Sequence, residues 1–542
     1  MRNVSPVTLS GSSRVSGDRP IKKLPQILCG VFLLLYILFF AIRAIAALLY
    51  AYPLEYGEGA VFHESAQLFR DHFAPGSLYP ANDAMPYRAG IYTPLFYYLQ
   101  ALTMFITGPA SMLGGRLITL AASLYIGISL YRVSRREPLA TGRPAGYGIS
   151  LAAAITPFAT SALYGWGVLA KGDVLAIALS LAAILRIYPI ESEWRRGQTP
   201  RPFVLAGILC GLALLTKQSA LAAPAAILIW LGIQRQWREA GGFLAAMLAV
   251  VGVTGIFFQL ATGGAFFKHI VTYNSQPYDF EFLWQGLLYF VPTHIVLLVL
   301  AFVWLLRPLI GRYERIGLWR IYFVTALLLS FSIGKVGANF NYYIEILCLV
   351  SLFGWWQLGR IMALRPELPF RLGSFRVGLA PVVLVLMVFQ LFNLHHVPFV
   401  ADGANTPGPS QFSQSTEVAA EVRTLEAHGP LLAEDAGWQA ALGLPVELDD
   451  PFVFGQLAQE GSWNSQPFLD KLKSGYFKAA FYKISQADTS EMALDQAVKD
   501  NTAAPFPRQF SPEVLQVLQD RSKFVPVKRI GPYLFLAWKE QP

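Results

Sequence analysis

Long apolar runs follow one another from near the N-terminus to about residue 397. Several are about 18 or more residues long, which is enough for an α-helix to cross the ~30 Å hydrocarbon core of a bilayer. Short polar turns separate the runs. The pattern predicts an α-helical polytopic membrane protein with about 11 transmembrane helices. The predicted spans are 25–50, 113–132, 146–164, 172–190, 202–216, 219–235, 241–262, 284–306, 318–334, 343–360 and 377–395.

Arginine-rich turns such as "YRVSRREPLATGRP" and "EWRRGQTPRP" predict the orientation of these spans. Positively charged loops favour the cytoplasmic side, so we expect these turns, and a cytoplasmic tail over 1–24, to lie inside. Arg14, Arg19, Lys22 and Lys23 precede the first span, which indicates an uncleaved signal anchor. With this parity, the chain after residue 397 lies outside the cytoplasmic (inner) membrane.

One apolar stretch, 91–108, does not fit as a crossing, because every later loop would then invert. It begins with Thr93 and Pro94 and carries a cluster of tyrosines that includes Tyr92. Tyrosine is enriched at membrane interfaces. We therefore expect a helix that lies in or dips into the outer leaflet, within a large first outer loop, 51–112.

The pattern changes near residue 398, where "ADGANTPGPSQFSQS" reads as a linker rich in proline, glycine and serine. Beyond it, helical pieces alternate with short strand-like runs, "GPLLAED", "AAFYKI" and "PYLFLAW". These features predict a transmembrane domain over 25–397 and a soluble extracytoplasmic α/β domain over 398–542.

Composition agrees with a membrane protein. The chain is 54% hydrophobic, has a mean hydropathy of +0.44 and is only 14% charged, against roughly 25% in soluble domains. The net charge of +9 does not indicate a nucleic-acid partner, because most arginines lie in the short inner loops. Cys29, Cys210 and Cys348 all lie inside apolar runs, so neither a disulfide framework nor a thiolate metal site is predicted.

Ionisable side chains recur on the predicted outer side. Glu55 and Glu58 stand three residues apart in "YPLEYGEG", where the first outer loop begins. Charges at or within a membrane are costly and are functional candidates by default, although a lysine at a span end also snorkels cheaply. The further candidates are Arg88, Tyr92, Lys171, Asp173, Lys217, Lys268, Lys335 and Glu345.

This mixture of cations and carboxylates suggests a reaction. Ammonium and guanidinium groups bind phosphate through charge-assisted hydrogen bonds, and a carboxylate can take the proton of an attacking hydroxyl. At the edge of the hydrocarbon, we expect a raised carboxyl pKa, which suits a general base. The residues thus indicate transfer of a group from a lipid-linked phosphate to a hydroxyl at the membrane surface.

Structural roles remain as alternatives for individual residues. Asp173 could cap the helix that follows it, Glu58 could be an ion-pair partner, and Tyr92 could anchor the chain at the interface. For the whole protein, the main alternative is a transporter or flippase of a lipid-linked sugar. That class favours internal symmetry and paired broken spans, which we do not find in the sequence. A non-catalytic scaffold would leave "EYGEG" unexplained.

Several short motifs occur in a fixed order. "EYGEGAVFHESA" is followed by "YTPLFYYLQAL", "GGRLITLAASL", "AKGDVLAIALSLAA" and "GLALLTK", and a soluble region closes the chain. In this order the chain resembles the GT-C superfamily of integral-membrane glycosyltransferases, in the bacterial branch related to protein O-mannosyltransferases and the aminoarabinose transferase of lipid A. The resemblance implies a GT-C fold.

The resemblance also implies an activity. It is inverting transfer of one sugar from a polyprenyl-phosphate donor to a hydroxyl of a cell-envelope acceptor, on the outer face of the cytoplasmic membrane. The catalytic carboxylate of the family lies in the first outer loop, which points to Glu58, with Glu55 close behind. Because Gly57 precedes Glu58 where the family often has an acidic pair, either glutamate remains an alternative for the base.

Other family positions carry over in part. Asp173 matches the acid of the second outer loop, and Lys217 keeps the position of a family lysine. Thr93 stands where the family has another lysine, so phosphate binding would fall to other cations, with Arg88 first. No cofactor is predicted, and no histidine pattern for a metal site occurs. A divalent cation between the two glutamates of "EYGE" remains an alternative.

Overall fold

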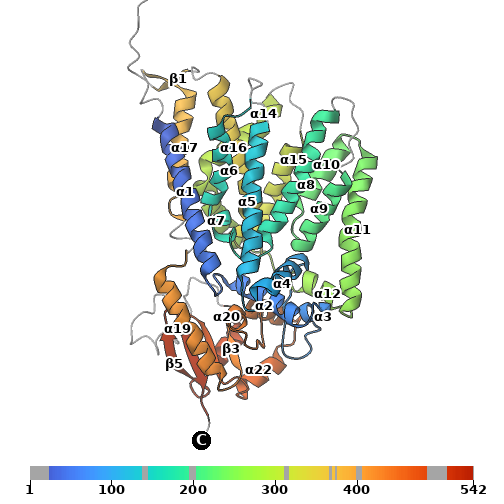
Figure 1. Ribbon diagram of the computed structural model, residues 1–542, viewed down its shortest axis with the longest axis vertical. Coiled ribbons are helices and arrows are strands. Elements are labelled where there is room, and N and C mark those ends of the chain that lie inside the picture. The colour runs from blue at the N-terminus through green and yellow to red at the C-terminus, as the bar shows by residue number, and fades with distance from the viewer. Residues whose placement is uncertain are drawn as a thin grey trace, which may run out of the picture.

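The computed structural model describes residues 24–136, 144–194, 203–310, 317–364, 369–372, 375–397, 406–484 and 509–540. Long, roughly parallel helices form a bundle, and a smaller unit of helices and strands lies at one end of it (Figure 1). The predicted cytoplasmic tail, 1–24, lies outside the described residues except for its last residue.

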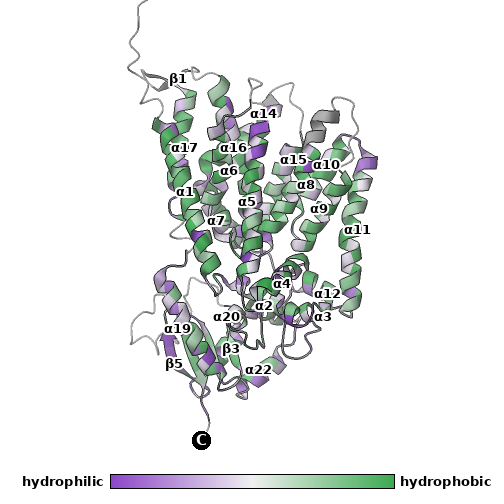
Figure 2. Cartoon of the chain, in the orientation of Figure 1, coloured by the Kyte–Doolittle hydropathy of each residue, from purple (hydrophilic) through white to green (hydrophobic). Residues whose placement is uncertain are grey.

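The bundle follows the predicted apolar runs closely, and its residues are predominantly hydrophobic (Figure 2). Large apolar side chains such as Leu34, Phe257 and Leu260 are exposed on its outside, as expected of a surface that meets lipid rather than water. The bundle helices are α1 (Leu24–Leu49), α5 (Leu113–Arg136), α6 (Tyr147–Ile155), α7 (Ser161–Trp166), α8 (Asp173–Trp194), α9 (Phe203–Thr216), α10 (Ala222–Ile233), α11 (Trp237–Ala261), α14 (Ile295–Ile310), α15 (Leu318–Ser330), α16 (Ile344–Leu364) and α17 (Leu379–Asn393).

The chain is a multi-pass membrane protein. Within the described residues, four helices are long and apolar enough to cross a membrane alone: Leu24–Leu49, Leu113–Arg136, Trp237–Ala261 and Phe340–Leu364. In the last of these, 72% of the most apolar window is buried, against 17% for Trp237–Ala261. The helix α16 therefore lies inside the bundle and α11 at its periphery. Six shorter apolar helices of 10–17 residues accompany them, and the total of eleven crossings stays a prediction.

One predicted span has a different form. Residues 284–306 do not make one straight helix, because α13 (Phe280–Thr293) and α14 meet at a bend of 89°. Pro292 lies in the last turn of α13, and proline lacks the N–H that would continue the helical ladder. The 310-helical turn η4 (Phe331–Gly334) packs against α13. The sequence is apolar on both sides of the bend, so the hydrophobic pattern did not predict the bend.

A layer of short helices lies between the bundle and the smaller unit (Figure 1). It contains α2 (Tyr56–Arg70), α3 (Pro75–Leu78), α4 (Leu95–Thr107), α12 (Ala265–Phe267) and the π-helical turn η3 (Lys268–Thr272). At 13 residues, α4 is only about 20 Å long, too short to cross a ~30 Å core upright. It packs instead along α2, which agrees with the expected non-crossing helix at 91–108.

Residues 406–484 and 509–540 form the smaller unit, called here the C-terminal unit. Its sheet has the order β3-β4-β6-β5, in which β3 and β4 are parallel and the other pairs antiparallel. The three predicted strand-like runs form β3 (Leu431–Ala433), β4 (Ala479–Lys483) and β6 (Tyr533–Trp538), and β5 (Phe524–Ile530) was not predicted. The helices are α19 (Pro409–Glu426), α20 (Ala436–Ala441), α21 (Pro451–Gln459), α22 (Gln466–Lys473) and α24 (Pro512–Gln519).

Both faces of this sheet are covered. Along β4, Phe481 packs in a cluster with Val418 of α19, whereas Tyr482 packs in a second cluster with Phe454 of α21. Successive side chains of a strand point to opposite faces, so a strand buried on both faces reads as a continuous apolar run. The second cluster also contains Tyr87, from the segment between α3 and α4. The core of the C-terminal unit is thus continuous with that segment.

Candidate functional site

The glutamate pair of "EYGEG" lies where α2 begins. Glu55 is the N-cap residue, and its Oε2 accepts a hydrogen bond of 3.0 Å from the backbone N–H of Glu58. An N-cap side chain that satisfies the third helical N–H is a standard way to start a helix. The spacing of three residues therefore follows from the helix start. The two carboxylates nevertheless contact different cations, Arg116 for Glu58 and Lys171 for Glu55.

Glu58 is fully buried in a bidentate ion pair with Arg116 of α5. The guanidinium Nε and Nη2 lie 2.8 and 2.9 Å from the two carboxylate oxygens. The backbone N–H groups of Leu54 and Ala170 donate to the same oxygens, each at 2.8 Å. Burial alone raises the pKa of Glu58, but Arg116 and the two backbone N–H groups together outweigh it and leave this pKa below its ordinary value. The expectation of a raised pKa at Glu58 is wrong, because a buried cation was not foreseen.

Glu55 has a different environment. Its Oε2 lies 3.1 Å from Lys171 Nζ, and the carboxylate side chain remains 22% exposed. The ammonium passes over Gly57, where an added Cβ would come within 2.6 Å of Lys171 Nζ. Gly57 thus leaves room for the lysine to reach Glu55. This ion pair borders an open space.

That space is a cavity of about 440 Å³. Its wall is assembled from segments far apart in the sequence. They lie within residues 55–57 at the start of α2, 91–92 before α4, 217–219 between α9 and α10, 273–276 after η3, Phe282 of α13, 332–342 before α16, and 450–453 and 509 of the C-terminal unit. Glu55, Tyr92, Lys217 and Lys335 all line it. The structure therefore brings two carboxylates, Glu55 and Asp450, and two lysines to one cavity.

Lys217 forms an ion pair with Asp173, the first residue of α8. Asn341 Nδ2 donates a hydrogen bond of 2.7 Å to the same carboxylate. The ammonium lies 4.8 Å from the ring centre of Tyr342 and 5.7 Å from that of Tyr92, distances at which an aromatic face attracts a cation. Asp173 therefore holds Lys217 at the cavity wall, a role beyond helix capping.

Amide oxygens at this wall are buried without a hydrogen-bond partner among the described residues. They are Gln218 Oε1, Gln276 Oε1 and Asn341 Oδ1. A buried acceptor without a partner is costly. Amide oxygens accept hydrogen bonds from hydroxyl groups, so the wall is suited to a ligand rich in hydroxyls.

The other predicted cations differ in position. Lys335 donates a hydrogen bond of 3.0 Å to Asn274 Oδ1, and burial together with Lys217 lowers its pKa to about 8. Arg88 lies outside the wall, because its guanidinium donates to Val446 O at 2.8 Å in the C-terminal unit. Lys268 is exposed, 5.7 Å from the ring centre of Tyr273. Of these three, only Lys335 borders the cavity.

Glu345 lies deeper in the bundle. The hydroxyl of Tyr322 donates a hydrogen bond of 2.5 Å to its carboxylate. A small cavity of about 50 Å³ contains Glu345, Asp173 and Lys217 in its wall. Lys217 and Asn341 also line the larger cavity. Glu345 thus belongs to an inner extension of the site.

Two participants were missed from the sequence. Arg116 stands in the quoted motif "GGRLITLAASL" but was not singled out, although a lone charge in an apolar run is a signal. Asp450 accepts a hydrogen bond of 2.6 Å from the hydroxyl of Tyr56, 394 residues earlier. No local pattern could have linked these two. Asp450 places the C-terminal unit beside Glu55.

Metal ligation was also considered at the glutamate pair. In the part of the chain that the structure describes, no three His, Cys, Asp or Glu side chains are grouped to hold a metal ion. Glu58 and Glu55 each have a cationic partner, Arg116 and Lys171. Each carboxylate is thus neutralised by a side chain of the protein.

Comparisons with known proteins bear on this geometry. Residues 92–257 match the family model of the dolichyl-phosphate-mannose-protein mannosyltransferases. A search of curated protein sequences finds no match. Among solved structures, ArnT from Cupriavidus metallidurans bound to undecaprenyl phosphate is similar with a TM-score of 0.53 and 13% identity, over 92% of this chain and 97% of that chain. Its apo state gives a TM-score of 0.52 and 14% identity over the same shares.

A further similar structure is the archaeal oligosaccharyltransferase AglB from Archaeoglobus fulgidus, with an inhibitory peptide and dolichol phosphate. Its TM-score is 0.45 at 10% identity, over 92% of this chain and 74% of that chain. The family match and the fold shared with ArnT confirm the predicted GT-C resemblance.

Proposed function

We propose that this chain, a GT-C superfamily membrane glycosyltransferase, moves one sugar with inversion from a polyprenyl-phosphate donor to an acceptor hydroxyl. The acceptor lies at the outer face of the cytoplasmic membrane, on the side of the C-terminal unit. The observation that carries the proposal is the cavity of about 440 Å³ that has Glu55 in its wall together with Lys217 and Lys335. It joins a partly exposed carboxylate to fixed positive charge.

Lys217 and Lys335 are the cations that we assign to the donor phosphate. Both line the cavity, and charge-assisted hydrogen bonds from ammonium groups are strong ligands for phosphate oxygens. Asp173 and the tyrosine rings beside Lys217 fix its direction. The ArnT structure of the same fold contains undecaprenyl phosphate, which supports a lipid-linked phosphate as donor.

Glu55 is the carboxylate that we assign as general base. Of the two glutamates, Glu58 is closed off from the cavity and has both oxygens occupied by Arg116 and backbone N–H groups. Glu55 is partly exposed at the wall. An acceptor hydroxyl can therefore approach its carboxylate without displacing a buried partner. Lys171 orients it. Glu58 is then a positioning residue that holds the start of α2 in place.

The reaction follows from these positions. A Glu55 oxygen takes the proton of the acceptor hydroxyl, and the hydroxyl oxygen forms a bond to the anomeric carbon of the donor sugar. The bond between that carbon and the phosphate oxygen breaks, and its electron pair leaves with the polyprenyl phosphate. Lys217 and Lys335 stabilise the charge that develops there. Attack from the face opposite the leaving phosphate inverts the anomeric centre.

The test uses membranes that contain wild type, Glu55→Gln or Glu58→Gln, with a pool of radiolabelled polyprenyl-phosphate sugars. We expect Glu55→Gln to lose transfer by about 10²–10⁴-fold, the usual contribution of a general base, while it remains folded and binds donor. Glu281, an exposed glutamate at the first turn of α13, provides the control Glu281→Gln, which should transfer as wild type. Transfer by Glu55→Gln at the wild-type rate, or none by wild type from any donor, would refute the proposal.

A further inference from the structure

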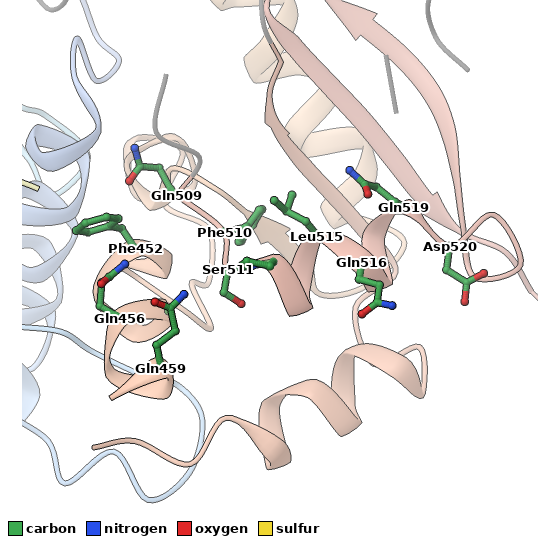
Figure 3. A pocket seen from close by; sticks show the side chains of 12 residues that line it. Phe452, Gln456, Gln459, Gln509, Phe510, Ser511, Leu515, Gln516, Gln519 and Asp520 are labelled. Carbon is green, nitrogen blue, oxygen red and sulfur yellow. The ribbon is translucent and has the colours of Figure 1, made fainter. Parts of the chain in front are cut away.

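A second cavity, of about 610 Å³, lies in the C-terminal unit between α21 and α24 (Figure 3). Of its 12 lining residues, five are glutamines: Gln456, Gln459, Gln509, Gln516 and Gln519. We call it the glutamine groove. The only charged side chain in its wall, as far as the chain is described, is Asp520. The wall therefore combines neutral amides with apolar side chains and has little charge.

The glutamines come in two helical pairs. Gln456 and Gln459 stand three residues apart on α21, and Gln516 and Gln519 three apart on α24. Residues three apart lie on the same face of a helix, so each helix presents two amides to the groove (Figure 3). The opposite faces carry the apolar residues of the core, for example Leu457. The polar sides of α21 and α24 therefore both contribute to the groove.

Four of these amides have no hydrogen-bond partner among the described residues. The side chains of Gln456, Gln459, Gln516 and Gln519 make no hydrogen bond with any residue that the structure describes. By contrast, Gln466 on the neighbouring α22 donates a hydrogen bond of 2.6 Å to Asp470. The groove thus concentrates amide donors and acceptors that remain available to a ligand.

The groove adjoins the cavity that contains Glu55. Phe452 and Gln509 line both spaces, and Figure 3 shows them at one end of the groove, with Asp520 at the other. The helix α21 begins at Asp450, which is hydrogen-bonded to Tyr56, the neighbour of Glu55. A chain molecule in the groove would therefore end beside the proposed base.

We propose that the glutamine groove binds the acceptor and that the acceptor is a neutral glycan, whose terminal hydroxyl reaches Glu55. The inference rests on the proposed function and specifies its acceptor. Each glutamine amide offers two donors and an acceptor, which match the adjacent hydroxyls of a sugar. The ring of Phe452, between the two spaces, offers an apolar face to the C–H side of a sugar ring.

Other acceptors fit this wall less well. A phosphorylated or otherwise anionic acceptor would need cations, and the described lining has neither lysine nor arginine. Its one carboxylate, Asp520, is paired with Lys523 at 2.6 Å. An extended peptide is typically bound by main-chain pairing with a free strand edge. Side chains of two helices and the turn before α24 form this groove, so side-chain amides rather than strand backbone meet the ligand.

The experiment measures binding to the full-length protein in lipid nanodiscs by saturation-transfer NMR and calorimetry. The probes are linear hexasaccharides of mannose, glucose, galactose and arabinofuranose, a serine- and threonine-rich peptide, and vesicles of anionic phospholipid. We expect at least one neutral hexasaccharide to bind. The double variant Gln456→Leu/Gln516→Leu should weaken it on the order of tenfold, because two hydrogen bonds are lost. The matched control Gln466→Leu should bind as wild type.

Each result decides the inference. Failure of every hexasaccharide to bind, binding that the double variant leaves unchanged, or binding of the peptide or vesicles that the double variant weakens would overturn it. The variants must unfold at the wild-type temperature. If Gln456→Leu/Gln516→Leu is unstable, Gln459→Leu/Gln519→Leu replaces it.

Failure of the proposed function gives a different pattern. Glu55→Gln should still bind the hexasaccharide although it transfers no sugar. If wild type transfers from no donor but the groove variants still lose binding, the enzymatic proposal fails and the glycan site remains. If transfer occurs and the groove variants leave the acceptor KM unchanged, the glycan site fails and the enzymatic proposal remains.

Discussion

Gly59 of α2 and Gly437 of α20 lie backbone against backbone: a Cβ on Gly59 would come within 2.9 Å of Gly437 Cα and would also collide with the carboxylate of Asp435. The absence of side chains at both positions allows the C-terminal unit to sit directly on the helix that Glu55 caps. The two glycines of "EYGEG" thus have separate tasks, since Gly57 makes room for Lys171.

We expect Gly59→Ala to loosen the C-terminal unit from α2. An added methyl against backbone forces a shift that typically costs about 1–3 kcal/mol. Limited proteolysis and the unfolding temperature measure the loss, and sugar transfer should fall with it. Gly76, which has open space around it, provides the control Gly76→Ala. The same behaviour in both variants would show that the close approach is unimportant.

We expect Glu58→Gln to destabilise the protein, whereas Glu55→Gln mainly affects transfer. Removing one partner of a fully buried ion pair leaves Arg116 uncompensated, at a typical cost of about 3–5 kcal/mol. The double variant Glu58→Gln/Arg116→Met should recover part of the lost unfolding temperature. An unchanged unfolding temperature for Glu58→Gln would contradict the structural role of this pair.

Asp435 should make stability depend on pH. Burial raises its pKa from 3.8 to about 7, although Lys483 nearby opposes the shift, and Glu55 and Glu434 add to it. Between these two values the folded chain keeps a proton that the unfolded chain has released, so stability falls as the pH rises from about 4 to about 7. Its side chain caps α20 by accepting from the Gly437 N–H at 2.9 Å.

The conservative variant Asp435→Asn keeps the cap and removes the titration. We expect its unfolding temperature to be close to that of wild type near pH 4 and to exceed it by a growing margin up to about pH 7. Above that value the margin should stay constant. Thermal unfolding across this range measures the margin, and a margin independent of pH would refute the prediction.

Lys335 should give donor binding an alkaline limit. Burial and the nearby Lys217 lower its pKa from 10.5 to about 8, so it carries its charge below this pH and loses it above. We expect the donor KM to rise as the pH increases through 8. Lys335→Arg, whose guanidinium stays protonated, should remove this rise. The control Lys268→Arg, at an exposed residue outside the cavity wall, should keep it.

Much of the bundle was predictable, because an apolar run of membrane length has few other structures open to it. The bend between α13 and α14 was not, since Pro292 lies within an otherwise uniform apolar run. The positions of the basic loops and the tyrosines of 91–108 both predicted that the short α4 does not cross the membrane. The three predicted strands were recognised from apolar runs, whereas β5, with Lys528 and Arg529 exposed or half-buried, lacks such a run.

The candidate site was predictable only in part. The sequence singled out Glu55, Lys217 and Lys335, which line one cavity. It ranked Glu58 first because nothing local indicated that Arg116 would enclose it. It also assigned Arg88 to phosphate by proximity along the chain, whereas its guanidinium joins the first outer loop to Val446. Contacts between residues so far apart in the sequence form only in the packed fold, so a local sequence pattern does not predict them.

The hydrogen bond between Tyr56 and Asp450 also has a consequence for biosynthesis. Tyr56 leaves the ribosome 394 residues before its partner, and β6, which lies between β4 and β5 in the sheet, ends only at Trp538. The hydrogen bond from Tyr56 can therefore form only after the chain has been synthesised at least as far as Asp450. A chain that ends before Asp450 lacks the residues of the C-terminal unit that complete the wall of the cavity around Glu55.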